Sequence, residues 1–157
     1  MSDQRRSTKD RTDQELAAYA DGHLLYEAQM FVLARQALPA ATNDFTKNVL
    51  LEVCVLHLRN LLDFFYPRGN AHDDDVVAAH YGGCSLPPIT LTLERARKRA
   101  HKELAHLTLD RQFGAPPSKA WDFDGLSADL RLVIDAFNRQ CDQAKLLEQC
   151  KSQLVKI

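Results

Sequence analysis

Apolar residues recur at helical spacing in four stretches of the chain, and proline and glycine separate these stretches. Thr12 and Glu15 open the first stretch with the pattern of a capping box, in which each residue's side chain bonds the other's backbone. Apolar positions then continue past Gly22 until Pro39 interrupts them. This pattern predicts a long first helix over residues 13–38.

The second stretch starts at Thr42 or Asn43, stops before Pro67 and is apolar on nearly every side. A helix of this kind packs against several others, so we expect it to be the central helix. Its polar positions are therefore informative, because a buried charge requires a partner. One side carries the following three residues, for which we predict a structural polar network around the arginine: Glu52, Arg59 and Asp63.

The third helix is expected over residues 92–107, where the apolar positions form one narrow stripe. The last helix is expected to begin at Asp124 or Ser127 and to continue towards the C-terminus as one extended element. We predict self-association through apolar residues in its second half: Phe137, Cys141, Ala144 and Leu147. Trp121, just before this helix, is interpreted as a packing anchor.

Together these elements predict an all-α fold, an up-and-down bundle of four main helices with a long central connector over residues 68–88. Residues 1–11 are polar and basic and are expected to form a flexible arm, and residues 12–157 a single domain. With 20 Lys and Arg against 21 Asp and Glu, the chain has no overall basic field to attract nucleic acid. No apolar run is long enough for a membrane span, so we expect a cytoplasmic protein without a membrane partner.

The cysteines follow no zinc-ligand or disulfide rhythm, and three of them occupy helical patterns as core residues: Cys54, Cys141 and Cys150. The acids Asp73–Asp75, flanked by His72 and His80, could suggest a metal site, but acids before Val76 are typical of a helix N-terminus. Two further metal alternatives remain open. One combines Glu103 and His106 in a single Glu-x-x-His motif, and the other adds His23, Glu27 and His57 from the first two helices. We predict no metal, and because the phosphate-binding glycine motifs are absent we also expect no cofactor.

The third helix is strongly basic within a nearly neutral protein. On a helical wheel, Arg95, Arg99, Lys102 and His106 lie within about 60° of one another. Arginine presents a planar donor fork to phosphate, and histidine exchanges a proton near neutral pH. This flank is therefore a candidate site for a phosphodiester.

Arg99 and His106 have the spacing Arg-x6-His, and Arg95 with His101 gives a second, overlapping fit. In this respect the chain resembles the HEPN superfamily of four-helix domains, many of which cleave RNA and carry an Arg-x(4–6)-His motif. Residues 57–65 and 105–108 more loosely resemble a family of small uncharacterised bacterial helical proteins. The HEPN resemblance implies a metal-independent endoribonuclease with Arg99 and His106 as the catalytic pair. From their place on the same basic flank, we expect Arg95 and Lys102 to bind phosphate.

The function that follows is a HEPN-like homodimer that binds or cleaves RNA through its basic helix. The first alternative is a non-catalytic, dimeric protein-interaction module in which the basic residues only solvate the surface. The second alternative is a metal-binding helical bundle.

Overall fold

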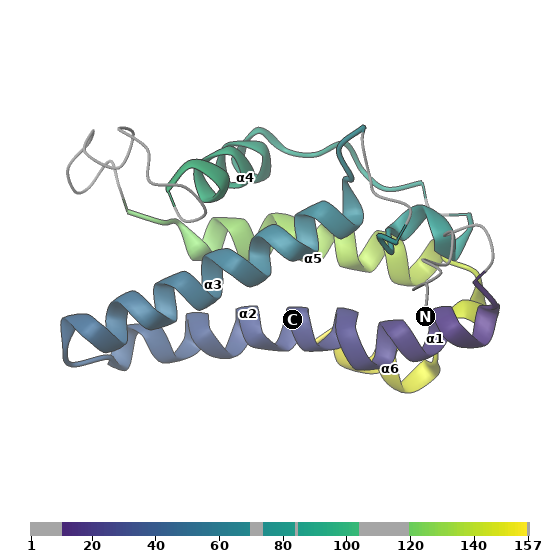
Figure 1. Ribbon diagram of the computed structural model, residues 1–157, viewed down its shortest axis with the longest axis horizontal. Coiled ribbons are helices and arrows are strands. Elements are labelled where there is room, and N and C mark those ends of the chain that lie inside the picture. The colour runs from purple at the N-terminus through teal and green to yellow at the C-terminus, as the bar shows by residue number, and fades with distance from the viewer. Residues whose placement is uncertain (1–10, 70–73, 84, 104–119, 157) are drawn as a thin grey trace, which may run out of the picture.

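The computed structural model describes residues 11–69, 74–83, 85–103 and 120–156. Every regular element within these ranges is helical, which confirms the all-α class (Figure 1). No helix in the described part of the chain combines the length and the apolar character that crossing a lipid bilayer requires.

The first helical element begins as the sequence indicates. Thr12 Oγ1 accepts a hydrogen bond from the Glu15 N–H, and the Glu15 carboxylate accepts one from the Thr12 N–H, so the predicted capping box is confirmed. The element remains helical to its end but changes type around Gly22, where the turns widen. Its consecutive parts are α1 (Asp13–Tyr19), the π-helical η2 (Ala20–Leu24), α2 (Leu25–Ala37) and the 3₁₀ turn η3 (Leu38–Ala40).

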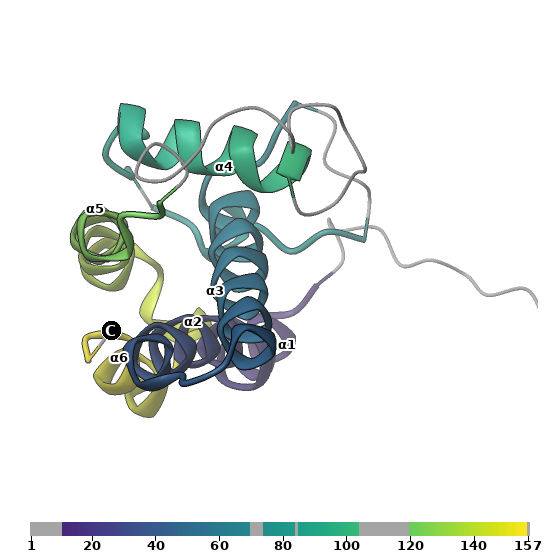
Figure 2. The ribbon, with the colours of Figure 1, turned by 90° about the vertical axis from the view of Figure 1, so that its left-hand side faces the viewer.

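The second helix, α3 (Asp44–Phe65), is capped by the Asn43 side chain, which accepts a hydrogen bond from the Thr46 N–H. It lies against α2 over much of its length and also contacts α4 (Leu91–Glu103). Viewed along the long axis, α3 lies between the first helix below it and α4, which crosses above it (Figure 2). The central position of α3 is therefore confirmed.

An aromatic cluster joins α3 to the connector and to α5 (Phe123–Gln140). The rings of Phe64, Phe65, Tyr81 and Phe137 pack edge to face with centroids 5.0–5.8 Å apart. Tyr81, at the end of the 3₁₀ turn η4 (Ala78–Tyr81), also donates from its hydroxyl to the Leu16 carbonyl. This side chain ties the connector to the first helix.

The prediction of one extended C-terminal helix is wrong. The backbone becomes extended at Cys141, and the Asp142 N–H donates to the Tyr81 carbonyl. After the 3₁₀ turn η6 (Gln143–Lys145), α6 (Glu148–Leu154) folds back and packs against the first helix. Leu146, Cys150 and Leu154 are thereby buried within the same chain.

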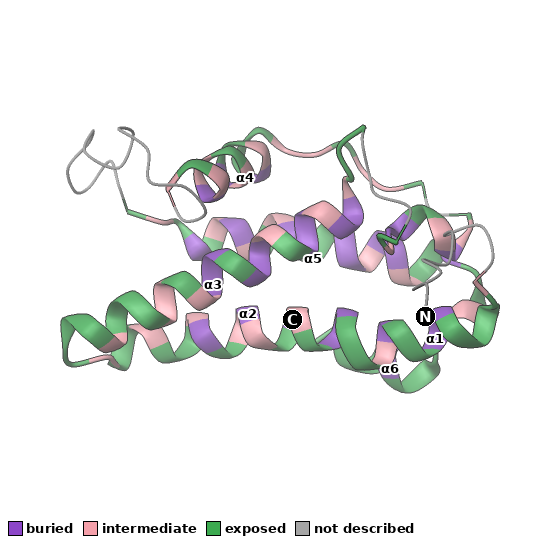
Figure 3. Ribbon diagram, viewed as in Figure 1, coloured by how far each residue is buried: buried purple, intermediate pink, exposed green. Residues whose placement is uncertain are grey.

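The predicted self-association residues do not form one helical surface, because Phe137 and Cys141 are buried in the core, whereas Ala144 and Leu147 are exposed beyond the end of α5. Large apolar side chains are instead exposed where α2 ends and α3 begins. Figure 3 shows this end of the helical pair mainly as exposed surface. Phe45 on α3 is 79% exposed.

Candidate functional site

A polar groove of about 560 Å³ lies between the first helix, α3, the start of the connector and α4. Four carboxylates and two arginines line it, with two histidines and an asparagine: Glu27, Asp63, Asp74, Asp75, Arg59, Arg68, His23, His101 and Asn60. Its volume is that of an ordinary small-molecule or nucleotide site. The groove is therefore the candidate functional site of the described structure.

One wall of the groove carries two rings. Tyr19 and His23 lie one turn apart at the entry to the π-helical segment, with ring centroids 4.9 Å apart and planes inclined by 43°. Burial, reinforced by the charge of Glu27, raises the pKa of the Tyr19 hydroxyl. Tyr19 therefore remains a neutral aromatic surface at physiological pH.

The floor contains a hydrogen-bonded triad that links α2 to α3. Glu27 Oε2 lies 2.6 Å from His57 Nδ1 and accepts a hydrogen bond of 2.9 Å from Asn60 Nδ2. His57 is buried, and the ring of Tyr26 packs edge to face against it. His57 and Asn60 therefore act here as hydrogen-bonded packing residues, and Asn60 also reaches the groove.

Arg59 lines the groove together with its ion-pair partner. Its Nε atom lies 3.6 Å from Asp63 Oδ2, one helical turn further along α3. The two side chains are 34% and 43% exposed, so this pair is at a solvated wall and contributes little to stability. Glu52 is exposed, and among the described ion pairs Arg59 is joined to Asp63 alone.

Helix α4 presents three different sides. Arg95, Lys98 and Lys102 are exposed on its outer side. His101 lines the groove, and Arg97 on the same flank donates to the Tyr66 carbonyl at 2.8 Å. This arrangement sets a cationic outer surface beside a groove in which carboxylates outnumber arginines.

Arg99 points to the other flank, towards the start of α5. Its Nε donates to both carboxylate oxygens of Glu103 at 2.8 and 2.9 Å, and its Nη1 donates to the Ala120 carbonyl at 3.1 Å. The guanidinium also stacks on Trp121 at 4.2 Å from the ring centroid, and Trp121 in turn stacks on Phe123. Trp121 is therefore the packing anchor that the sequence predicts, and Arg99 holds it in place.

The structure thus separates the sequence-predicted residues. Arg95 and Lys102 lie on the outer side of α4, whereas Arg99 lies at its junction with α5. Arg59 and Asp63 are at the groove, with Glu52 outside it. His106 is outside the described residues, so the Arg99–His106 pair stays a prediction.

None of the metal alternatives gains a site from the described residues, in which no three His, Cys, Asp or Glu side chains converge to hold an ion. The His106 half of the Glu-x-x-His motif is outside the described ranges, as are His72 and Asp73. The three helical cysteines are buried, as predicted. Burial raises the pKa of Cys54 to about 11 and of Cys150 to about 12, so these thiols are poor nucleophiles.

Comparison with known proteins gives no match to a family model, to a curated protein or to a solved structure. The site must therefore be interpreted from its own chemistry.

Sequence reasoning considered His23, Glu27 and Arg59 but did not place them in one groove. It also missed Tyr19, Arg68 and the groove-lining role of His101. The available signal was the tyrosine and histidine four residues apart on the first helix, opposite the polar side of α3. Which sides of these helices face each other is decided by tertiary packing, and spacing within one helix does not contain that information.

Proposed function

We propose that this protein is a HEPN-like helical-bundle domain that binds single-stranded RNA through the outer side of α4. The observation that carries the proposal is the exposure of Arg95, Lys98 and Lys102 on one side of that helix. Residues 91–103 hold five Lys and Arg and two Asp and Glu, a net charge of +3, while the whole chain has −1. A local patch of this kind attracts the phosphate backbone without a basic protein overall.

The catalytic part of the proposal rests on the resemblance to RNA-cleaving HEPN domains. His106 acts as general acid or base, and Arg99 with Lys102 binds the scissile phosphate. Arg99 is held by Glu103 and Trp121, so a phosphate must compete with this internal ion pair. Seven residues of continuous helix span about 10.5 Å, which is far for Arg99 and His106 of one chain to serve the same phosphate. The proposal therefore includes a dimer that brings Arg99 of one copy towards His106 of the other.

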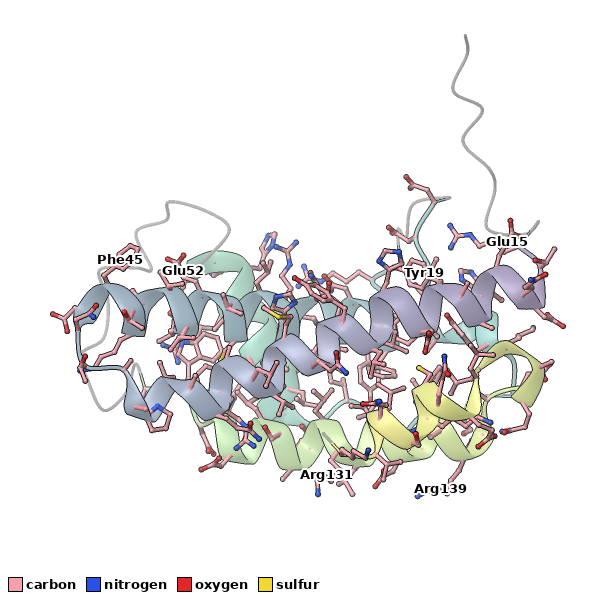
Figure 4. All side chains as sticks on the ribbon, turned by 90° about the horizontal axis from the view of Figure 1, so that it is seen from below. Glu15, Tyr19, Phe45, Glu52, Arg131 and Arg139 are labelled. Carbon is pink, nitrogen blue, oxygen red and sulfur yellow. The ribbon has the colours of Figure 1, made fainter. Side chains whose placement is uncertain are left out.

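The test measures binding and cleavage of mixed single-stranded RNA by the purified protein. Lys98→Glu/Lys102→Glu should weaken binding at least tenfold and flatten its salt dependence, because two phosphate contacts are lost. The matched control is Arg131→Glu/Arg139→Glu, which removes two exposed cations from the outer side of α5 (Figure 4) and should leave affinity within twofold. Equal losses in the two double variants would show that only net charge matters and would reject a site on α4.

Cleavage is tested separately with His106→Ala. This variant should bind RNA like the wild type and leave it intact. Cleavage at the wild-type rate by His106→Ala, or no cleavage by the wild type, would reject the proposed nuclease activity. RNA binding would still be judged from the charge-reversal variants.

A second candidate function, the dimeric protein-interaction module, is favoured by a different observation. One side of α3 carries Phe45, Val49, Glu52 and Leu56 at alternating spacings of four and three residues, and all four are exposed. Figure 4 shows Phe45 and Glu52 pointing outwards from the same side of the helix. An apolar stripe of this kind is suited to pairing with a second helix.

A further inference from the structure

We propose that the groove beside α4 binds an unstacked nucleobase. The inference rests on the proposed function in one respect: the base would belong to an RNA strand whose phosphates lie on the outer side of α4. The groove itself, however, is argued from its own lining.

The first argument is charge. Four carboxylates face two arginines in the groove, and one of these arginines is already paired with Asp63. Such a lining repels a phosphate, whereas carboxylate oxygens accept hydrogen bonds from the N–H groups at the edge of a base. The groove and the outer side of α4 are therefore suited to different parts of a nucleotide.

The second argument is shape and surface. Bases in single-stranded RNA are recognised by stacking on aromatic or histidine rings. Tyr19 and His23 supply two adjacent rings on one wall, and His23 is exposed. The opposite polar wall, with Arg59, Asn60 and Asp63 on α3, offers both donors and acceptors to a base edge.

The third argument is continuity with α4. His101 lines the groove, and on the helical wheel it is about 60° from Lys98. A strand bound along the exposed cations therefore passes the mouth of the groove. A base that unstacks at this point can enter the groove and stack on the rings of Tyr19 and His23, while its phosphate stays on the outer side of α4.

Guanine matches this lining better than uracil does. Its O6 and N7 accept from an arginine fork, and its N1–H and N2–H groups donate to carboxylates. Uracil has a single N–H donor and no amino group. We expect guanosine to bind more tightly than uridine.

The experiment titrates guanosine, uridine and inorganic phosphate separately into the protein and follows the imidazole signals of His23 and His101 by NMR. Guanosine should shift both signals, and uridine should do so at several-fold higher concentration. Phosphate should not reproduce the shifts that guanosine causes. Tyr19→Leu should weaken guanosine binding about tenfold, because it removes a stacking ring. The matched control, Tyr26→Leu, changes an exposed tyrosine of α2 that packs on His57 but does not line the groove, and it should stay within twofold. It separates the loss of a stacking ring from a disturbed floor.

Thermal denaturation first establishes that both tyrosine variants are folded. Asp63→Asn, with the control Asp44→Asn at an exposed position of α3 outside the groove, repeats the comparison on α3. The inference is overturned if guanosine shifts neither histidine, if phosphate reproduces the guanosine shifts, or if the Tyr19 and Tyr26 variants behave alike.

The RNA measurements distinguish this failure from failure of the proposed function. RNA binding that depends on Lys98 and Lys102 but not on Tyr19 would retain the function and reject the base site. Guanosine binding that depends on Tyr19, without any RNA binding, would reject the function and retain a nucleoside site.

Discussion

At the residue scale, the basic side chains of α4 differ in their contacts and exposure although they are close in sequence. Arg97 and Arg99 are fixed by carbonyl groups of neighbouring segments, whereas Arg95 is exposed. Position on the helix separates Arg97 from Arg95, because a residue two places away lies on a different side. Arg99 is only about 40° from Arg95 on the helical wheel, and it differs because Glu103 and the Ala120 carbonyl lie within its reach.

Arg99→Ala should lower the free energy of unfolding by about 1–2 kcal/mol, because the stack on Trp121 and the hydrogen bonds to Glu103 and Ala120 are lost together. Arg95→Ala is the matched control on the same helix and should stay within about 0.5 kcal/mol of wild type. Urea denaturation measures both. An Arg99 variant as stable as the Arg95 variant would show that the junction with α5 does not depend on this clamp.

The same result decides how an activity assay must be interpreted. If Arg99→Ala loses RNA cleavage, the rate has to be corrected for the folded fraction before a catalytic role is assigned. Arg99→Lys keeps the charge but loses the planar stack, so it separates charge from packing.

At the element scale, sequence signals were most informative where a local group determines the structure. The Thr12 capping box and the Asn43 cap mark their helix starts correctly, because each involves a side chain and backbone three residues apart. The end of α5 was missed, because no proline or glycine marks Cys141. The chain turns at Cys141, and the next residue, Asp142, donates its N–H to the Tyr81 carbonyl. This hydrogen bond joins residues that are distant in sequence.

Two glycines provide the prediction at this scale. Gly22→Ala should stabilise the protein by about 0.5–1 kcal/mol, because a helical glycine is entropically costly and an added Cβ at this position meets nothing within 4 Å. Gly83→Ala should destabilise it by about 1–2 kcal/mol, because its φ is +64° and its Cβ would approach the Gln140 carbonyl oxygen to 2.8 Å. Thermal denaturation of both variants tests the pair. A destabilised Gly22→Ala would mean that the widened π-helical turn requires glycine.

At the scale of the whole molecule, the all-helical class and the central position of α3 could be predicted, whereas the groove could not. Apolar periodicity identifies each helix and the side it buries. The groove depends on how the first helix, α3 and α4 meet, and Tyr19 and His101 are 82 residues apart in the chain. The same limitation explains the misplaced self-association surface. Phe137 and Cys141 are buried, and the chain folds back after Cys141 so that Leu146, Cys150 and Leu154 pack into the same core.

The exposed stripe on α3 leads to the last prediction, a symmetric dimer through this helix. A two-fold axis between Val55 and Leu56, with the two α3 helices antiparallel, places Leu56 at the centre and Glu52 of each copy opposite Arg59 of the other. The two charges lie equally far from the axis and have opposite signs, so the surface is self-complementary. Such a contact would bring the second copy to the wall of the groove that contains Arg59.

Analytical ultracentrifugation over the micromolar range tests this arrangement. The wild type should be dimeric at high micromolar concentration, and Leu56→Lys should be monomeric because two lysines would meet at the centre of the contact. Leu132→Lys is the control, since Leu132 is an exposed leucine on α5, away from α3, and its replacement should leave the dimer intact. Glu52→Arg should weaken association at least tenfold at low salt and less at high salt, because it places like charges opposite each other and salt screens them. A wild type that sediments as a monomer throughout, or a Leu132 variant that dissociates as readily as the Leu56 variant, would exclude α3 as the dimer surface.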